Sequence, residues 1–174
     1  MRRPYKAKCY WITGLPGSGK SFLADALVEA LRKRGEAVLH LDGDALRAVF
    51  GERFGYHRED RVYLAMVYAR LCKMFVSQGF VVVIATVSLF TKVHQWNREN
   101  IDGYFEIFLN ATSTLLSERD KKNLYSQGDS LNGLITENEY APPKCPHIEF
   151  IIEDNIDPNV LLRKIFERLD ESCS

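Results

Sequence analysis

One eight-residue stretch near the N-terminus combines glycines, a lysine and a serine at a fixed spacing. The sequence Gly14-Leu15-Pro16-Gly17-Ser18-Gly19-Lys20-Ser21 fits the pattern G-x-x-x-x-G-K-[ST]. Glycines let consecutive backbone N–H groups turn toward an anion, because no side chain stands in the way. The lysine adds a positive charge for the outer phosphates, and the serine hydroxyl can take one Mg²⁺ position. The stretch therefore predicts a loop that binds the phosphates of a nucleoside triphosphate.

Two carboxylates follow the next strand-like run of the chain. The run Ala37 to Leu41 has a strand pattern, and Asp42-Gly43-Asp44 comes directly after it. Open parallel sheets bind ligands at the carboxyl ends of their strands, so we expect both carboxylates to lie near the phosphate loop. A solvent-exposed Asp-Gly-Asp turn is the alternative. Because the pair follows a phosphate loop and a strand, the functional interpretation is favoured.

Apolar residues alternate between strand-like and helix-like spacing along the whole chain. The pattern predicts strands over 9–13, 37–41, 80–86, 104–109 and 148–152, and helices over 22–31, 45–50, 61–77, 92–100, 113–120 and 159–169. This alternation is typical of a three-layer α/β fold, a doubly wound parallel sheet of about five strands with helices on both faces. The 174 residues predict a single domain over 1–174. Residues 121–146, which have no apolar pattern, are expected to form a lid.

The composition limits the partners and the compartment of the protein. Lysine plus arginine and aspartate plus glutamate number 23 each, so the formal net charge is zero at pH 7. This balance argues against a partner such as nucleic acid or an anionic membrane. The longest apolar run, residues 80–90, is too short to span a bilayer, and Met1-Arg2-Arg3 does not open a signal peptide. Four widely separated cysteines predict reduced thiols in a cytoplasmic protein.

Several further segments resemble the adenylyl-sulfate kinase (APS kinase) family over nearly the whole chain. They are GLPGSGKS at Gly14 to Ser21, LDGDALR at Leu41 to Arg47, GYHREDR at Gly55 to Arg61, ATVSLF at Ala85 to Phe90, YFEIFL at Tyr104 to Leu109 and ERDKKNLY at Glu118 to Tyr125. The resemblance implies a P-loop NTPase fold and a homodimer. It also implies a kinase that uses MgATP to phosphorylate the ribose 3′-hydroxyl of a small nucleotide acceptor, adenosine 5′-phosphosulfate, in sulfate assimilation.

The resemblance also implies roles for individual residues. Lys20 and Asp44 are the implied catalytic residues, Asp44 as the group that accepts the hydroxyl proton, and Ser21 and Asp42 lie near Mg²⁺. Arg119 is implied in ATP binding together with the phosphate loop. The residues implied in acceptor binding are Asp42, Asp44, Arg47, Tyr56, Arg61, Ser88 and Lys122. In the alternative interpretation, Arg61 is a surface arginine of a helix, and Lys121 and Lys122 form a solvated pair.

Some positions depart from the family pattern, and all of them lie on the acceptor side. Leu64, Met66 and Val67 stand where the family usually has an asparagine and paired arginines. Leu89 replaces a proline, and residues 133–136 replace a phenylalanine-threonine-glycine stretch. A branch that includes a cytidine diphosphoramidate kinase of capsule decoration has segments similar to those at 88–90, 97–98 and 104–107. Cytidine diphosphoramidate is therefore the alternative acceptor.

Two other functions remain open on the sequence alone, a non-catalytic nucleotide-dependent switch and a degenerate kinase kept as a subunit. Switch GTPases usually carry an N-K-x-D motif, which this sequence lacks. The intact Lys20, Ser21 and Asp44 argue against a degenerate kinase. The sequence therefore favours a catalytically active kinase.

Overall fold

A five-stranded parallel sheet forms the middle layer of the protein. The computed structural model describes residues 7–51, 54–55, 57–119 and 140–171. Strands β1 (Cys9–Gly14), β2 (Val38–Asp42), β3 (Val81–Thr86), β4 (Tyr104–Ala111) and β5 (Ile148–Ile152) lie in the order β2-β3-β1-β4-β5. All four pairings between neighbouring strands are parallel. The predicted sheet is therefore confirmed in its strand number and direction.

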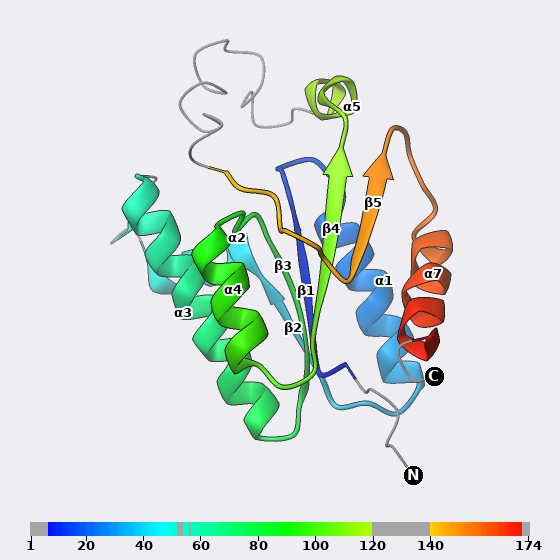
Figure 1. The fold of residues 1–174 in the computed structure, drawn as a ribbon, viewed down its shortest axis with the longest axis horizontal. Helices are drawn as coiled ribbons and strands as arrows, with labels where there is room; N and C mark the ends of the chain where they lie inside the picture. Colours follow the sequence, from blue (N-terminus) through cyan, green and yellow to red (C-terminus); the bar gives the residue numbers. More distant parts are fainter. Residues whose placement is uncertain (1–6, 52–53, 56, 120–139, 172–174) are drawn as a thin grey trace.

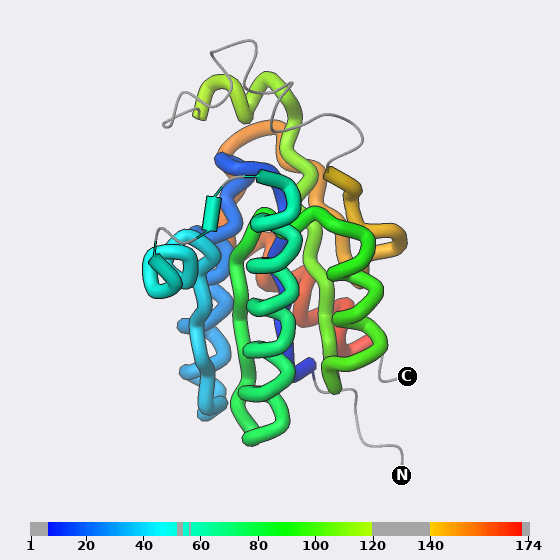
Figure 2. The backbone as a smooth tube through the Cα atoms, turned by 90° about the vertical axis from the view of Figure 1, so that its left-hand side faces the viewer, coloured from blue at the N-terminus to red at the C-terminus, as the bar shows by residue number. Residues whose placement is uncertain are grey.

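Helices cover both faces of this sheet (Figure 1). Helices α1 (Lys20–Lys33) and α7 (Pro158–Glu171) lie on one face, and α3 (Arg58–Ser77) and α4 (Thr91–Asn100) lie on the other. Figure 2 shows α3 and α4 side by side in front of the sheet. Two short helices, α2 (Gly43–Phe50) and α5 (Ser113–Glu118), follow the carboxyl ends of β2 and β4. The arrangement confirms the predicted three-layer α/β fold.

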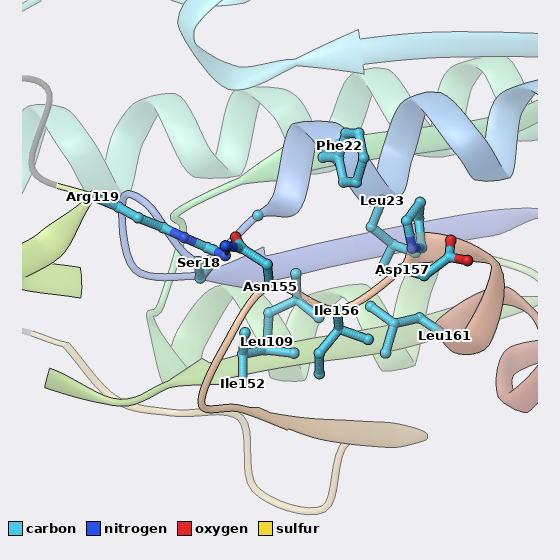
Figure 3. Close-up of a pocket in the computed structure, with 12 residues that line it drawn as sticks. Ser18, Phe22, Leu23, Leu109, Arg119, Ile152, Asn155, Ile156, Asp157 and Leu161 are labelled. Carbon is cyan, nitrogen blue, oxygen red and sulfur yellow. Dashed lines mark hydrogen bonds between the residues drawn. The ribbon is translucent and has the colours of Figure 1, made fainter. Parts of the chain in front are cut away.

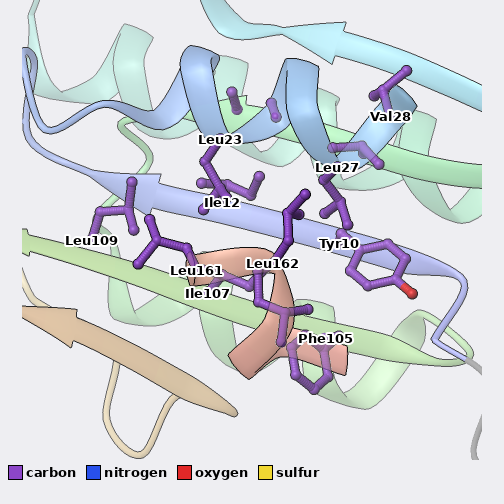
Figure 4. Packing of buried hydrophobic residues seen from close by; sticks show 14 of the residues in the cluster. Tyr10, Ile12, Leu23, Leu27, Val28, Phe105, Ile107, Leu109, Leu161 and Leu162 are labelled. Atoms are coloured by element: carbon purple, nitrogen blue, oxygen red, sulfur yellow. The ribbon is translucent and has the colours of Figure 1, made fainter. Parts of the chain in front are cut away.

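The sheet separates two apolar cores, and β1 contributes to both. Tyr10 and Ile12 pack toward α1 and α7 in the cluster of Figure 4. Cys9 and Trp11, which alternate with them, pack toward α3 and α4. Because successive side chains of a strand point to opposite faces, a central strand covered on both faces must be apolar throughout. All six residues of β1 are accordingly buried.

Several helices begin earlier than the sequence pattern predicts, and for α2 and α3 the cause is local. Helix α2 begins at Gly43, because the Asp42 side chain accepts the N–H groups of Asp44 at 2.9 Å and Ala45 at 3.1 Å and so caps the helix. Helix α3 begins at Arg58, three residues before the predicted start at 61. Acidic residues in its first turn favour this start, because they lie at the positive end of the helix dipole.

The described residues also bear on the predicted lid, thiols and membrane contact. Residues 120–139 lie outside the described chain, so the lid prediction over 121–146 is testable here only for 140–146. Cys9, Cys72 and Cys145 are free thiols, the first two of them buried. Within the described parts of the chain, every helix is too short or too polar to cross a membrane.

A buried cluster of polar side chains joins β4 to α4. Glu106 on β4 is fully buried, and its Oε1 lies 2.6 Å from His94 Nδ1 and accepts the Tyr104 hydroxyl at 2.7 Å. Its Oε2 pairs with the Arg98 guanidinium. Burial alone would raise the pKa of Glu106, but the hydrogen bond and charge of His94, with Tyr104 and Arg98, bring it below its ordinary value. Glu106 is therefore ionised in the folded protein.

We expect Glu106→Gln to lower the free energy of unfolding by about 3 kcal/mol at neutral pH, because its buried partners lose their counter-charge. Since folding lowers the pKa of Glu106, its contribution is present above the ordinary value of 4.5 and is lost as the pH falls through the folded-state value. Urea unfolding followed by circular dichroism at about pH 7 and about pH 4 measures both effects. The stability gap between wild type and variant should narrow at the lower pH.

Glu149→Gln on the neighbouring strand β5 is the matched control. Its side chain is exposed and accepts a hydrogen bond from Asn110 at 2.9 Å. We expect the control to change stability by less than about 0.5 kcal/mol. A gap between wild type and Glu106→Gln that stays constant with pH would contradict the ionised buried carboxylate.

Candidate active site

The glycine-rich loop runs from the end of β1 to the start of α1. Gly17 and Gly19 have φ angles of 82° and 93°, which favour glycine. At Gly14 a Cβ atom would lie 2.5 Å from the carbonyl oxygen of Leu109 on β4, so a side chain there would collide with the backbone. The positive end of α1 follows the loop directly. The loop thus has the backbone and the helix dipole of an anion-binding site.

Lys20 and Ser21 are the first two residues of α1, and their side chains make different hydrogen bonds. The Lys20 ammonium donates to the carbonyl oxygen of Leu15 at 2.7 Å, across the loop. The Ser21 hydroxyl donates to Asp42 Oδ2 at 3.1 Å. This bond joins the phosphate loop to the end of β2, as the sequence order predicted. It also places a hydroxyl and a carboxylate oxygen together.

This oxygen pair fits a Mg²⁺ ion held jointly by protein and phosphate. Mg²⁺ prefers oxygen ligands and usually takes one or two from the protein and the rest from water and phosphates. Ser21 and Asp42 supply two such ligands. Among the described residues no group of three or more histidine, cysteine or acidic side chains could hold a metal. The donors therefore suit an ion that arrives with a nucleotide.

An open cleft of about 460 Å³ lies beside the phosphate loop on the side of β4 and β5 (Figure 3). Its lining comes from the loop and α1, from β4 and the residue after α5, and from the stretch between the end of β5 and the first turn of α7; the residues are Ser18, Gly19, Phe22, Leu23, Leu109, Arg119, Ile152, Asn155, Ile156, Asp157, Pro158 and Leu161. The size and the mostly apolar lining suit a small-molecule site with a few orienting polar groups.

Two polar side chains orient this cleft toward a ligand. The Arg119 guanidinium donates to the carbonyl oxygen of Gly17 at 3.2 Å and to the Asn155 side chain. The buried Ser18 hydroxyl has no hydrogen-bond partner among the described residues. A buried hydroxyl without a partner is costly, and a phosphate oxygen could satisfy it. The predicted contribution of Arg119 to the donor site therefore has a geometric basis.

On the other side of the loop, the two predicted acceptor arginines make defined contacts. Arg47 donates to the carbonyl oxygens of Phe54 at 3.1 Å and Gly55 at 3.0 Å. Arg61 donates to the Tyr140 hydroxyl, and its guanidinium carbon lies 5.1 Å from the centre of that ring. Arg61 is therefore held by an aromatic residue, which disfavours the alternative of a plain surface arginine.

The remaining predicted acceptor residues are placed only in part. Asp44 lies in the first turn of α2, next to Asp42. Ser88 is buried, with its hydroxyl 2.7 Å from the Thr86 hydroxyl, so any contact with an acceptor stays a prediction. Tyr56 and Lys122 lie outside the described residues.

Sequence reasoning missed two residues that the fold brings to this edge. Asn155 lies three residues after the carboxyl end of β5, and Asp42 is the last residue of β2, so the same strand-end rule could have found Asn155. Tyr140 lies 79 residues from Arg61 in the chain. No local pattern connects these two positions, and only the tertiary structure shows their contact.

Comparison with known proteins gives one consistent result. A family model described as adenylylsulphate kinase matches residues 6–151. The cytidine diphosphoramidate kinase of Campylobacter jejuni is 36% identical over 117 residues, which cover 67% of this chain and 68% of that protein. The adenylyl-sulfate kinase of Pseudomonas aeruginosa is 32% identical over 165 residues, which cover 92% of this chain and 84% of that protein.

The solved structures give the same result at the level of the fold. The APS kinase of Mycobacterium tuberculosis, solved in complex with AMPPNP and APS, superposes with a TM-score of 0.78 at 25% identity. The match covers 94% of this chain and 98% of that chain. The P-loop kinase fold implied by the sequence resemblance is therefore confirmed.

We expect Gly14→Ala to weaken nucleotide binding at least tenfold and to lower stability by about 1–3 kcal/mol, because the added Cβ would displace the loop from β4. Gly35→Ala is the matched control, since Gly35 has a positive φ of 82° but no atom within 4 Å of a Cβ. The control should lose about 1 kcal/mol from backbone strain and keep its nucleotide affinity. Calorimetric titration with an ATP analogue measures the nucleotide affinity, and thermal unfolding measures the stability. Equal affinities in the two variants would refute the crowding argument.

Proposed function

The chain belongs to the adenylylsulphate kinase family, and on that premise we propose that it is an ATP-dependent kinase acting on adenosine 5′-phosphosulfate. The enzyme transfers the γ-phosphoryl group of ATP to the ribose 3′-hydroxyl of this acceptor. The observation that carries the proposal is the hydrogen bond between Ser21 and Asp42. This bond places the phosphate loop beside the first turn of α2, where Asp44 lies.

The donor half of the site binds ATP. The loop 14–21 takes the phosphates, and the cleft beside it takes the base and ribose, with Arg119 at its edge. Lys20 exchanges its bond to the Leu15 carbonyl oxygen for phosphate oxygens. Ser21 and Asp42 would hold a Mg²⁺ ion, which when bound would neutralise negative charge on the phosphates. Lys20 adds a fixed positive charge where charge develops during transfer.

In the acceptor half, Asp44 accepts the hydroxyl proton and arginines hold the anionic 5′ group. Asp44 and Arg47 are three residues apart on α2, so their side chains leave the same face of the helix. Arginine suits paired oxygens, because its planar fork donates two parallel hydrogen bonds. Arg61 takes the second position, beside Tyr140.

A buried tyrosine fixes the start of α2 in place. The Tyr68 hydroxyl donates to the carbonyl oxygen of Gly43 at 3.2 Å. Burial raises the pKa of Tyr68; Arg47 opposes this shift, and Asp44 and Asp42 add to it. The hydroxyl therefore stays protonated and keeps donating.

One relative favours a second candidate acceptor, cytidine diphosphoramidate. The protein of that name in Campylobacter jejuni is 36% identical to this chain. Leu64 and Met66 are buried in the core between the sheet and α3, so they offer no hydrogen bond where the family usually has polar residues. We keep adenosine 5′-phosphosulfate first, because the adenylyl-sulfate kinases match over most of the chain.

The acceptor assignment is tested by comparing kcat/KM for adenosine 5′-phosphosulfate and cytidine diphosphoramidate at fixed MgATP. We expect a preference of at least about a hundredfold, because a site built for one base leaves its polar groups unpaired with another. A preference for the cytidine compound would replace the first candidate with the second. MgATP binding without transfer to either compound would defeat the kinase proposal and favour the nucleotide-dependent switch.

Asp44→Asn should lower kcat by roughly 10² to 10⁴ while the KM for ATP changes little, because the amide keeps the shape and loses the proton acceptor. Steady-state kinetics with saturating acceptor measure the effect. Asp102→Asn, in an exposed turn before β4, is the control and should leave both constants unchanged. A near-wild-type kcat for Asp44→Asn would move the role elsewhere, with Asp42 as the first candidate.

The remaining parts of the proposal are the oligomeric state and the compartment of the protein. We propose a homodimer, as the sequence resemblance implies, in the cytoplasm, as the four widely separated cysteines predict. Size-exclusion chromatography with light scattering at micromolar concentration tests the assembly. A monomer that retains full activity would remove the dimer from the proposal.

A further inference from the structure

His94 is a buried histidine whose two ring nitrogens both face hydrogen-bond acceptors. Its Nε2 lies 2.9 Å from the carbonyl oxygen of Ser88, and its Nδ1 lies 2.6 Å from Glu106 Oε1. A carbonyl oxygen only accepts, so Nε2 carries a hydrogen. Its Nδ1 faces the Glu106 carboxylate, which also pairs with Arg98. Both ring nitrogens of His94 are therefore held by acceptor oxygens, and Nε2 donates to the Ser88 carbonyl group.

The carbonyl group that His94 holds belongs to a segment that runs along the acceptor side. Ser88 lies two residues after the end of β3 and is followed by Leu89 and Phe90. The Leu89 carbonyl oxygen accepts the N–H group of Ala141 at 2.9 Å. The Phe90 ring stacks on the Tyr140 ring, with the two ring centres 6.1 Å apart and the planes inclined by 18°. The segment 88–90 thus contacts both Tyr140 and Ala141 and fixes their positions.

Tyr140 in turn meets one of the proposed acceptor arginines. Its hydroxyl accepts a hydrogen bond from Arg61, and its ring lies under the same guanidinium. A continuous set of contacts therefore leads from Glu106 through His94 and the segment 88–90 to Tyr140 and Arg61. Its last member, Arg61, is the proposed contact with the anionic group of the acceptor.

The same buried cluster holds the chain beyond Tyr140 at a second place. Arg98 donates to the carbonyl oxygen of Lys144 at 2.8 Å. The backbone N–H group of Glu106 donates to His147 Nδ1 at 3.0 Å. Burial lowers the pKa of His147, with opposing contributions from Glu106, which raises it, and from Arg98 and Arg168. Its Nδ1 thus remains an acceptor, and the segment 140–147 is fixed at both ends.

We propose that His94 is a positioning residue for acceptor binding, acting through its Nε2 hydrogen bond to the Ser88 carbonyl oxygen. The proposal rests on the proposed function, because it assigns Arg61 to the acceptor's anionic group. His94 touches neither ATP nor the acceptor. It fixes the 88–90 segment, which fixes Tyr140, which orients the Arg61 guanidinium. The contacts in this set run from β4 and α4 through the segment 88–90 to Tyr140 and Arg61 on the acceptor side, so we expect His94 to act on acceptor binding and to leave ATP binding unchanged.

Two substitutions at His94 separate this role from a general contribution to stability. In His94→Gln the amide nitrogen reaches the place of Nε2 and can keep the bond to Ser88, but the bond to Glu106 is lost. In His94→Asn the amide nitrogen reaches the place of Nδ1 and can keep the bond to Glu106, but the bond to Ser88 is lost. Each variant thus loses one of the two hydrogen bonds of His94 and can keep the other.

We expect His94→Asn to raise the acceptor KM by about tenfold or more, because a loosened binding group costs affinity steeply. The KM for ATP should stay within about twofold of wild type. His94→Gln should keep the acceptor KM within about threefold. Equal effects of the two variants on the acceptor KM, or an equal rise in the KM for ATP, would overturn the proposal.

A structural readout decides the proposal without any catalysis. The Ala141 amide should exchange its hydrogen at least tenfold faster in His94→Asn than in wild type, and at the wild-type rate in His94→Gln, while amides of β1 exchange as in wild type. Unchanged exchange at Ala141 in His94→Asn would overturn the proposal. If wild type phosphorylates neither acceptor, the proposed function fails, and this measurement still decides whether His94 holds the segment.

Glu106→Gln is the second variant, should the His94 variants fold poorly. Its side-chain amide can donate to Nδ1 of a neutral His94, and Nε2 then keeps its hydrogen and its bond to Ser88. Stability should fall while the acceptor KM stays within about threefold of wild type. A tenfold rise in the acceptor KM would show that the negative charge of Glu106, and not the Nε2 bond of His94, positions the segment 88–90. That result would overturn the role proposed for His94.

Discussion

The close approach of β1 to β4 at Gly14 is the constraint on which the site depends. Gly14 pairs with Leu109 in the parallel register, and a Cβ atom at Gly14 would lie 2.5 Å from the Leu109 carbonyl oxygen. The chain leaves the sheet at this point and turns into α1. Since all the pairings are parallel, the segments after β2, β3, β4 and β5 leave at the same edge. The phosphate loop therefore contacts the Asp42 carboxylate through Ser21 and also borders the cleft that Asn155 helps to line.

The two faces of the sheet stabilise this edge by different physical means. Toward α1 and α7 the core is built from apolar side chains, whose burial is non-directional and tolerates small shifts. Toward α4 the fully buried Glu106 has several directional partners, among them His94, Arg98 and Tyr104. Such a cluster costs desolvation energy, but it fixes angles that apolar contacts leave free. The side with the directional contacts is also the side that holds Tyr140 and Arg61.

The donor and acceptor halves of the site also differ in how closely their residues follow the adenylyl-sulfate kinase pattern. The donor half, with Lys20 and Ser21 on α1, keeps the residues that phosphate chemistry requires. The acceptor half departs from the adenylyl-sulfate kinase pattern at Leu64 and Met66, which the structure places in the apolar core. Phosphates are the same in every kinase that uses ATP, so the donor half is constrained by chemistry. The acceptor differs among relatives, so its contacts can change while the fold is kept.

The sequence by itself determined the fold class, the five strands and the phosphate loop. Strand spacing, helix spacing and the glycine-rich motif are local patterns, because a side chain's periodicity is set by its own backbone. Local pattern missed the start of α2 at Gly43, since the cap depends on where the Asp42 side chain points. It missed the start of α3 at Arg58 as well.

Only the tertiary structure decided which distant side chains meet. The contacts of Ser21 with Asp42, of Arg119 with Asn155 and of Arg61 with Tyr140 join residues 21, 36 and 79 positions apart. The two hydrogen bonds of His94 likewise come from partners six and twelve positions away that meet it only in the packed core. Hydrogen-bond partners and protonation states depend on packing between elements, and no periodicity within one element encodes them.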